Sequence, residues 1–94
     1  MNSQSRPIDT SSVSLPVDIL ALAERLAEHV HDVYVRNRLA QGWRFGPFRD
    51  DVARENPTLV PYDELSESEK DIDRQTTLET LKAIIALGYR LERR

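Results

Sequence analysis

The chain has 94 residues, of which 39% are hydrophobic and 31% are charged, and its formal net charge is −3. This length fits one small domain, which buries only about 60–65% of the surface that its unfolded chain exposes. The chain has no cysteine and no basic stripe, which excludes disulfides and thiolate metal sites and gives no footprint for nucleic acid.

Residues 1–14 are rich in Ser, Asn, Gln and Thr and carry almost nothing to bury. They are predicted to form a flexible tail ahead of a single domain at residues 15–94. They lack the apolar core of a signal peptide, and no apolar run is long enough to span a bilayer. We therefore expect a cytoplasmic protein with no membrane partner.

The first helix is predicted from about residue 16 to about residue 40. Ser14 is the expected N-cap, Pro16 suits the first turn, and Gly42 is expected to end the helix in a left-handed conformation. Apolar residues recur at steps of three and four and form one continuous face: Ile19, Leu22, Leu26, Val30 and Val33.

The stretch from residue 41 to residue 65 holds the only Trp, both Phe residues and three of the five prolines. Each X-Pro pair disfavours a helix at the preceding residue, so this crossover is predicted to be irregular. One helical turn is expected around Asp50–Glu55. At most, Thr58–Val60 forms a very short strand pair with Tyr89–Leu91.

The second helix is predicted over about residues 66–87. Ser66 and Glu69 have the spacing of a capping box, and Gly88 is the expected end. The expected buried face of this helix consists of Ile72, Leu78, Leu81, Ile84 and Ile85. The predicted fold class is therefore mainly α, with two long amphipathic helices joined by the crossover.

The crossover also holds the candidate ligand site. Trp43 and Phe45 lie two apart in an extended stretch and should face the same way. Such a platform suits stacking on a flat heteroaromatic group, while Arg49 can hold an anion. Asp50 and Tyr62 are expected to bond sugar or base edges.

A second interpretation of these residues stays open. The aromatic side chains can instead fill the core, because a small domain needs every large aromatic for burial. Arg49 and Asp50 can instead pair with each other, or with Lys70 and Asp73, as a structural lattice.

No metal site and no catalytic residue are expected. His29 and His31 lie two apart on a helix, about 200° from each other, and cannot share one ion. His31 shares a face with Glu28 and Asp32, but it is expected to bond the crossover backbone. No nucleophile stands with its base and no glycine loop matches a phosphate-binding pattern, so we expect a protein with no enzyme activity and no cofactor.

Several polar and aromatic positions at fixed spacing resemble the ryanodine receptor repeat, the RyR domain. The resemblance covers about Leu22 to Leu91. It rests on His31-Asp32, Arg38, Gly42-Trp43-x-Phe45-Gly46-Pro47-x-Arg49-Asp50-Asp51, Pro57-x-Leu59-Val60-Pro61-Tyr62, Leu65-Ser66-Glu67-x-Glu69-Lys70, Asp73-Arg74-x-Thr76, Glu79-Thr80-Leu81-Lys82 and Ala86-Leu87-Gly88-Tyr89. The chain departs from the family at Tyr34, Asn56 and Ile72, where the family usually has Trp, His and an aromatic residue.

The resemblance implies a compact, mostly helical unit without catalytic activity. Repeats of this family occur as tandem pairs related by a pseudo-twofold axis, and stand-alone bacterial relatives resemble sensor modules for nucleotide-type signals. For a single repeat this implies a homodimer in which Trp43 of each chain meets one flat ligand. The alternative is a protein-interaction or assembly module that binds no small ligand.

Overall fold

The computed structural model describes residues 5–94, and it is mainly helical. The elements in order are α1 (Val17–Leu20), α2 (Ala23–Ala40), the short 3-10 helix η1 (Tyr62–Glu64) and α3 (Glu67–Ala86). Within residues 5–94 there is no strand, only two isolated bridges. The predicted fold class, with two long helices and an irregular crossover, is confirmed.

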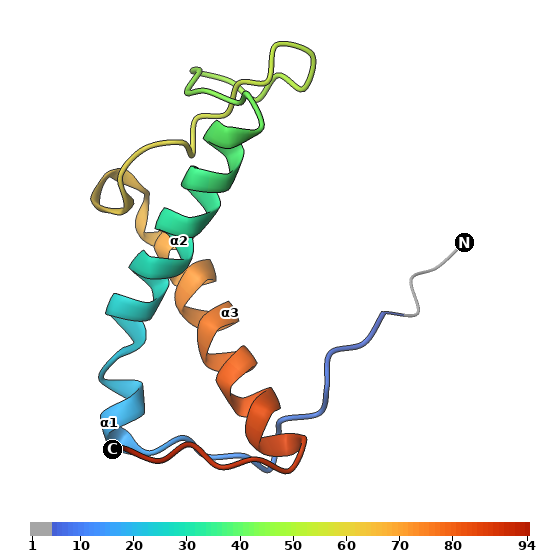
Figure 1. Cartoon of the computed structure of the whole chain (residues 1–94), viewed down its shortest axis with the longest axis vertical. Coiled ribbons are helices and arrows are strands. Elements are labelled where there is room, and N and C mark those ends of the chain that lie inside the picture. The colour runs from blue at the N-terminus through green and yellow to red at the C-terminus, as the bar shows by residue number, and fades with distance from the viewer. Residues whose placement is uncertain (1–4) are drawn as a thin grey trace.

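The two long helices meet at one place. Figure 1 shows that α3 begins beside the middle of α2 and that the two helices diverge from there, with the crossover above them. The small core lies at this junction, where Ala27 of α2 meets Tyr62 and Leu65, with Val60 against them. Residues 88–94 run back from the end of α3 toward α1 and close the base of a triangle.

The predicted first helix is divided in two. α1 ends at Leu20, and α2 begins only at Ala23, after a turn in which Leu22 N–H donates to the Ile19 carbonyl. Leu15, which precedes α1, is buried. Ser14 as N-cap was wrong, because Pro16 occupies that position and no side chain caps the helix.

Both long helices end as the glycines indicate. Gly42 has a φ of 89°, and Trp43 N–H donates to the Arg38 carbonyl across it. Gly88 has a φ of 104°, and Tyr89 N–H donates to the Ile84 carbonyl in the same way. Each of these two bonds spans a left-handed glycine, as in the Schellman motif. The motif satisfies carbonyl groups that the last turn of a helix leaves free.

α3 begins with the predicted capping box. The Ser66 side chain accepts from Glu69 N–H, and the Glu69 carboxylate accepts from Ser66 N–H at 3.0 Å. Its expected apolar face is only partly buried, because the Ile72 side chain is 65% exposed. Ile72 instead lies at the rim of a cavity between α2 and α3.

The crossover is held by backbone bridges and side-chain caps. Glu55 pairs with both Arg44 and Asp50. The expected helical turn at residues 50–55 is a plain turn, in which the Asp50 carboxylate accepts from Val52 N–H and Ala53 N–H, both at 3.0 Å. The Gly46 backbone lies so close to Glu55 that a Cβ atom added to Gly46 would be 2.5 Å from the Glu55 Cβ.

The expected strand pair at residues 58–60 and 89–91 was wrong. Asn56 Oδ1 accepts from both the backbone N–H and the hydroxyl of Thr58, at 2.9 and 2.8 Å. These bonds fold the segment that begins at Thr58 into a turn. A short polar side chain such as that of Asn56 competes with the hydrogen bonds of a sheet for the same N–H groups.

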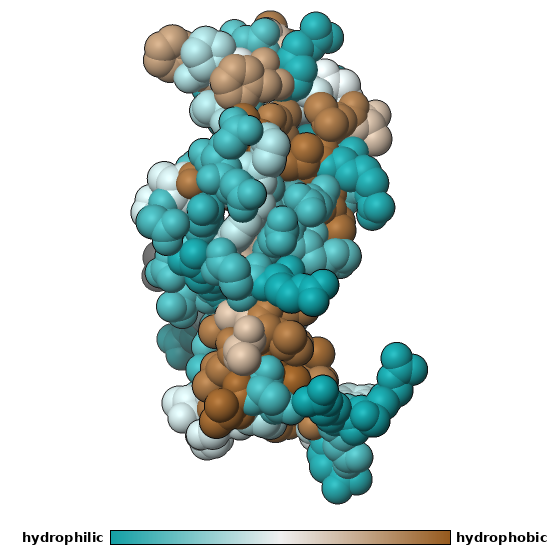
Figure 2. All heavy atoms as spheres, turned by 90° about the vertical axis from the view of Figure 1, so that its left-hand side faces the viewer, coloured by the Kyte–Doolittle hydropathy of each residue, from teal (hydrophilic) through white to brown (hydrophobic). Residues whose placement is uncertain are grey.

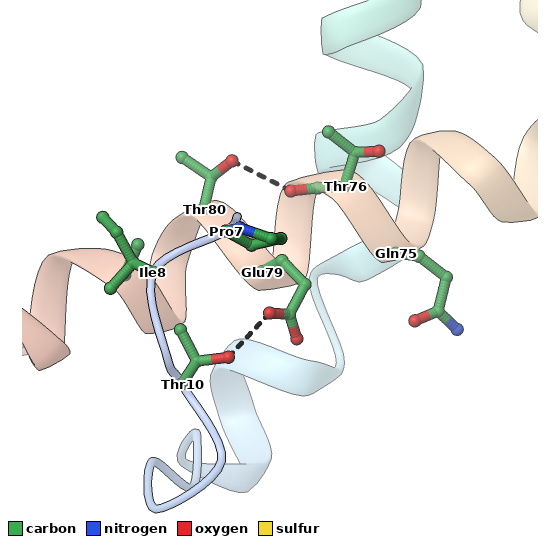
Figure 3. A pocket seen from close by; sticks show the side chains of 8 residues that line it. Pro7, Ile8, Thr10, Gln75, Thr76, Glu79 and Thr80 are labelled. Carbon is green, nitrogen blue, oxygen red and sulfur yellow. Dashed lines mark hydrogen bonds between the residues drawn. The ribbon is translucent and has the colours of Figure 1, made fainter. Parts of the chain in front are cut away.

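The N-terminal segment crosses the outer face of α3 (Figure 3). Thr10 donates a hydrogen bond of 2.7 Å to Glu79 Oε1, and a hollow of about 430 Å³ lies between Pro7, Ile8 and the helix. This bond lowers the pKa of Glu79. Residues 1–4 of the predicted tail lie outside the described residues.

Apolar surface gathers at the two ends of the molecule, separated by a hydrophilic middle (Figure 2). Val17 and Leu20 of α1 are exposed at one end. Phe45, Phe48 and Val52 of the crossover are exposed at the other. No helix within residues 5–94 is both long and apolar enough to cross a membrane.

Candidate functional site

The Trp43 side chain lies beside two guanidinium groups. The Cζ atoms of Arg38 and Arg49 are 5.2 and 5.3 Å from the centre of the indole ring. Arg38 reaches it from the last turn of α2, and Arg49 comes from the loop of the crossover. The indole is half-buried rather than sealed in the core. A cation within about 6 Å of an indole centre is attracted by the negative face of the ring.

Arg49 is shared between this ring and a carboxylate. Its Nε donates to Asp51 Oδ1 at 2.8 Å, and this contact raises the pKa of Arg49. The Arg49 side chain is 57% exposed and the Asp51 side chain 73%, so water weakens their ion pair. Arg49 is therefore free to move to an anion of higher charge. Neither Lys70 nor Asp73, the expected lattice partners, takes part in this pair.

The two other predicted residues of the crossover have different environments. The Phe45 side chain is 56% exposed and faces solvent. The Asp50 carboxylate is occupied by its own turn, since Val52 and Ala53 donate to it. Asp50 thus orders the loop that carries Arg49, whereas Phe45 offers open apolar surface near Trp43.

Tyr62 is not brought to this group. Its ring is buried in the junction of α2 and α3, 6.2 Å from the His31 ring, and Lys70 Nζ lies 5.4 Å from its centre. The buried hydroxyl has no hydrogen-bond partner of suitable geometry among the described residues. Burial, and then the nearby Glu24 carboxylate, raise the pKa of Tyr62.

The comparison with known families agrees with this arrangement of helices and crossover. The RyR domain family model matches residues 4–93, nearly the whole chain. The chain belongs to the RyR domain family.

A continuous series of rings and cations runs through this RyR domain from the α3 start to the crossover. The His31 and Tyr34 ring centres are 6.1 Å apart, and the Arg38 Cζ atom lies 5.6 Å from the Tyr34 centre. Arg38 thus lies near both Tyr34 and Trp43. The series consists of Lys70, Tyr62, His31, Tyr34, Arg38, Trp43 and Arg49.

Four residues of this series were not predicted to bind a ligand: Lys70 and His31 lie beside Tyr62, and the other two, Tyr34 and Arg38, lead to Trp43. Their spacing of four residues places them on one face of α2, next to the Gly42 stop that turns Trp43 back toward them. The pattern of an aromatic residue, an arginine four later and a tryptophan just past the helix end is the signal that could have found them.

His31 serves the scaffold of the RyR domain, as predicted. Its Nε2 lies 2.7 Å from the Val60 carbonyl, which ties α2 to the crossover backbone. No cluster of three His, Cys, Asp or Glu side chains in residues 5–94 is placed to hold a metal ion.

Proposed function

We propose that this RyR domain is a non-enzymatic binding module for a nucleotide-like ligand, with a flat ring and an anionic group. One observation carries the proposal: the half-buried Trp43 indole is flanked by two arginines, of which Arg49 is exposed and pairs with the exposed Asp51 carboxylate. The indole supplies a stacking surface and the guanidinium groups supply charge-assisted hydrogen bonds to a phosphate.

The local charge supports an anionic ligand. Residues 36–55 carry five arginines against three acidic side chains, whereas the whole chain has a net charge of −3. Arg38 and Arg49 therefore lie in a part of the chain with a net positive charge, where the field favours an anion. Arg38 remains beside the ring from α2, and Arg49 leaves Asp51 to reach the ligand.

A second copy of the chain completes the site in this proposal. Trp43 is half-buried and lines none of the three cavities described for the domain. A ring stacked on it would keep one face in water, unless the crossover of a second protomer covers that face. An isologous homodimer would present Trp43 from each chain to one ligand. The proposal places this assembly in the cytoplasm, where nucleotides occur.

The test uses Trp43 as its own reporter, because it is the only tryptophan. We expect ATP, ADP-ribose or a cyclic nucleotide to change its fluorescence and to bind in calorimetry. Trp43→Ala should weaken binding by about 5- to 150-fold, which corresponds to about 1–3 kcal/mol for a stacked base.

The matched control is Tyr89→Ala, which removes an exposed aromatic side chain at the other end of the molecule. It should leave the affinity unchanged. Tight nucleotide binding by Trp43→Ala would remove this residue from the site. No binding of any nucleotide would overturn the proposed function.

The second candidate is an assembly module with no small ligand. It is favoured by the exposed apolar side chains of the crossover, Phe48 at 79% and Val52 at 96%. A thermal-shift screen separates the two, since a ligand at 100 times its Kd should add about 2.7 kcal/mol to the stability of the native state. A screen without any shift would favour assembly.

A further inference from the structure

A cavity of about 400 Å³ opens between α2, α3 and the crossover, apart from Trp43. This volume is within the usual range for small-molecule sites, about 300–1,000 Å³. Much of its wall is apolar, and the exposed side chains of Val30 and Ile72 stand at its rim. The residues around it are Val30, His31, Tyr34, Thr58, Leu65, Glu69, Ile72 and Asp73.

The Thr58 hydroxyl proton of this cavity is already used. Thr58 donates its hydroxyl proton to Asn56 Oδ1 at 2.8 Å. Asn56 Nδ2 in turn donates to the Tyr34 hydroxyl at 3.3 Å. The Tyr34 and Thr58 oxygens are 3.5 Å apart, longer than a normal O–H···O bond. The Thr58 hydroxyl therefore offers lone pairs to a ligand rather than a proton.

The buried imidazole of His31 also offers a lone pair to this cavity. The His31 side chain is only 4% exposed, and its Nε2 donates to the Val60 carbonyl at 2.7 Å. In the neutral ring this assigns the proton to Nε2, so Nδ1 carries a lone pair. Nδ1 lies 3.9 Å from Asp73 Oδ2, too far for a hydrogen bond.

Two carboxylates add negative charge without a cation to balance it. The Asp73 side chain is 26% exposed and accepts no hydrogen bond from residues 5–94. Glu69 uses Oε1 for the capping box at Ser66, which leaves its second oxygen.

The nearby cations are held elsewhere. Arg74 bonds both oxygens of Glu24, and Lys70 lies over the Tyr62 ring and near Glu67. The cavity thus presents apolar walls, two carboxylates and the acceptor lone pairs of Thr58 and His31.

We propose that this cavity binds a small organic cation, an ammonium or guanidinium group on a short apolar stem. A partly buried carboxylate is costly without a partner, and a cation that brings only donors satisfies Asp73, Glu69 and the His31 lone pair together. The Val30 and Ile72 side chains cover the methylene groups of the stem. This site is separate from the Trp43 site and does not depend on what binds there.

The raised pKa of Asp73 agrees with a partly buried carboxylate that lacks a strong cationic partner. Burial raises the pKa of Asp73, Glu69 raises it further from the same helix, and His31 of α2 opposes them. We therefore expect the cavity to bind a cation more tightly as the pH rises through the raised pKa of Asp73, because only the ionised carboxylate attracts the cation.

The test uses butylammonium and butylguanidinium as probes, with butanol and butyrate as neutral and anionic controls of similar shape. We expect amide NMR shifts at residues lining the cavity and a change at the His31 Nδ1 signal, with Nε2 remaining protonated. Both cations should bind at least tenfold more tightly than butanol, and butyrate should not bind.

Asp73→Asn keeps the shape of the side chain and should weaken cation binding at least tenfold. Asp71→Asn is the matched control, because Asp71 lies on α3 but outside the cavity wall, and it should bind as the unmodified chain does. Equal affinity for butanol and butylammonium would overturn the proposal. Unchanged cation binding by Asp73→Asn would overturn it as well.

Discussion

Arg49 has two partners, and this makes Asp51 a competitor of any anionic ligand. The guanidinium donates to Asp51 at 2.8 Å while it lies over the Trp43 ring. A phosphate must displace the carboxylate, which costs the Arg49–Asp51 contact and leaves a negative charge near the ligand. Removing that charge should help a ligand without touching the stacking surface.

We predict that Asp51→Asn binds anionic nucleotides about two- to tenfold more tightly, which is about 0.4–1.4 kcal/mol. The gain should shrink at high salt, because exposed charges are screened. Calorimetry at 50 and 300 mM salt measures both effects. Asp63→Asn removes an exposed carboxylate from η1 and should change nothing. Weaker binding by Asp51→Asn would show that Asp51 orders the loop rather than competes.

Asp73 gives a second residue-scale prediction, on stability. Its pKa is raised in the folded state, chiefly by burial. Between the ordinary value of 3.8 and the raised value, the folded chain holds a proton that the unfolded chain has lost. The free energy of unfolding therefore falls as the pH rises through that window.

Asp73→Asn should remove that pH dependence. We expect its Tm to match that of the unmodified chain below the window and to exceed it at pH 7. Thermal unfolding followed by circular dichroism between pH 3 and pH 8 measures the difference, with Asp71→Asn as the reference. A lower Tm for Asp73→Asn at pH 7 would show that the carboxylate stabilises the fold.

At the scale of elements, α3 depends on its first turn. The Ser66 hydroxyl accepts from Glu69 N–H, and the Ser66 N–H and hydroxyl lower the pKa of Glu69. A lowered pKa means that the carboxylate stabilises the fold fully above its ordinary value of 4.5 and loses this effect as the pH falls through the depressed value.

We predict that Ser66→Ala lowers the free energy of unfolding by about 1 kcal/mol, the usual cost of losing a serine N-cap. This corresponds to a Tm lower by about 4–8 °C for a chain of this size. Ser68→Ala, two residues further on, should cost far less. If the stability of Ser66→Ala no longer falls at acid pH, the acid dependence of the unmodified chain comes from the contact between Ser66 and Glu69. An unchanged Tm would contradict the role of the cap.

At the scale of the whole molecule, the chain is more open than a compact domain of its size. Its accessible surface is 7461 Å², against about 5,500 Å² expected for its mass. Its radius of gyration is 16.0 Å, against about 12 Å. The extended N-terminal segment explains part of this difference, and the rest is a surface that a second copy can cover.

We predict a homodimer through the crossover, measured by sedimentation at rising protein concentration. Phe48→Asp should shift the chain to the monomer, because it places a charge on an apolar interface. Val17→Asp, an equally exposed position in α1, should leave the dimer intact. Dissociation by Val17→Asp alone would assign the interface to the opposite end.

The long helices and their ends could be predicted because their causes are local. Apolar spacing, the Ser66 cap and the two glycines act within one or two turns. The break after Leu20 could not be predicted, because no Gly or Pro lies at residues 21–22 to mark it. No strand forms at Thr58 because the Asn56 side chain, two residues earlier, accepts from the Thr58 N–H group that a sheet would need.

The candidate site could be predicted only in part. Trp43 and Arg49 are close in sequence and meet in the structure. The position of Tyr62 depends on how the crossover folds back onto α2 and α3, which no short-range pattern encodes. The contact between Arg38 and Trp43 was not predicted because it arises only when the Gly42 turn brings the indole to the end of α2.

Glu55 joins Arg44 and Asp50 through single bridges, and within residues 5–94 no ladder extends further. A fold built in this way has no long row of unpaired N–H and C=O groups along a sheet edge. Such edges are where one protein chain recruits another into fibrils. In the homodimer proposed above, two copies of this chain therefore associate through side chains rather than through backbone ladders.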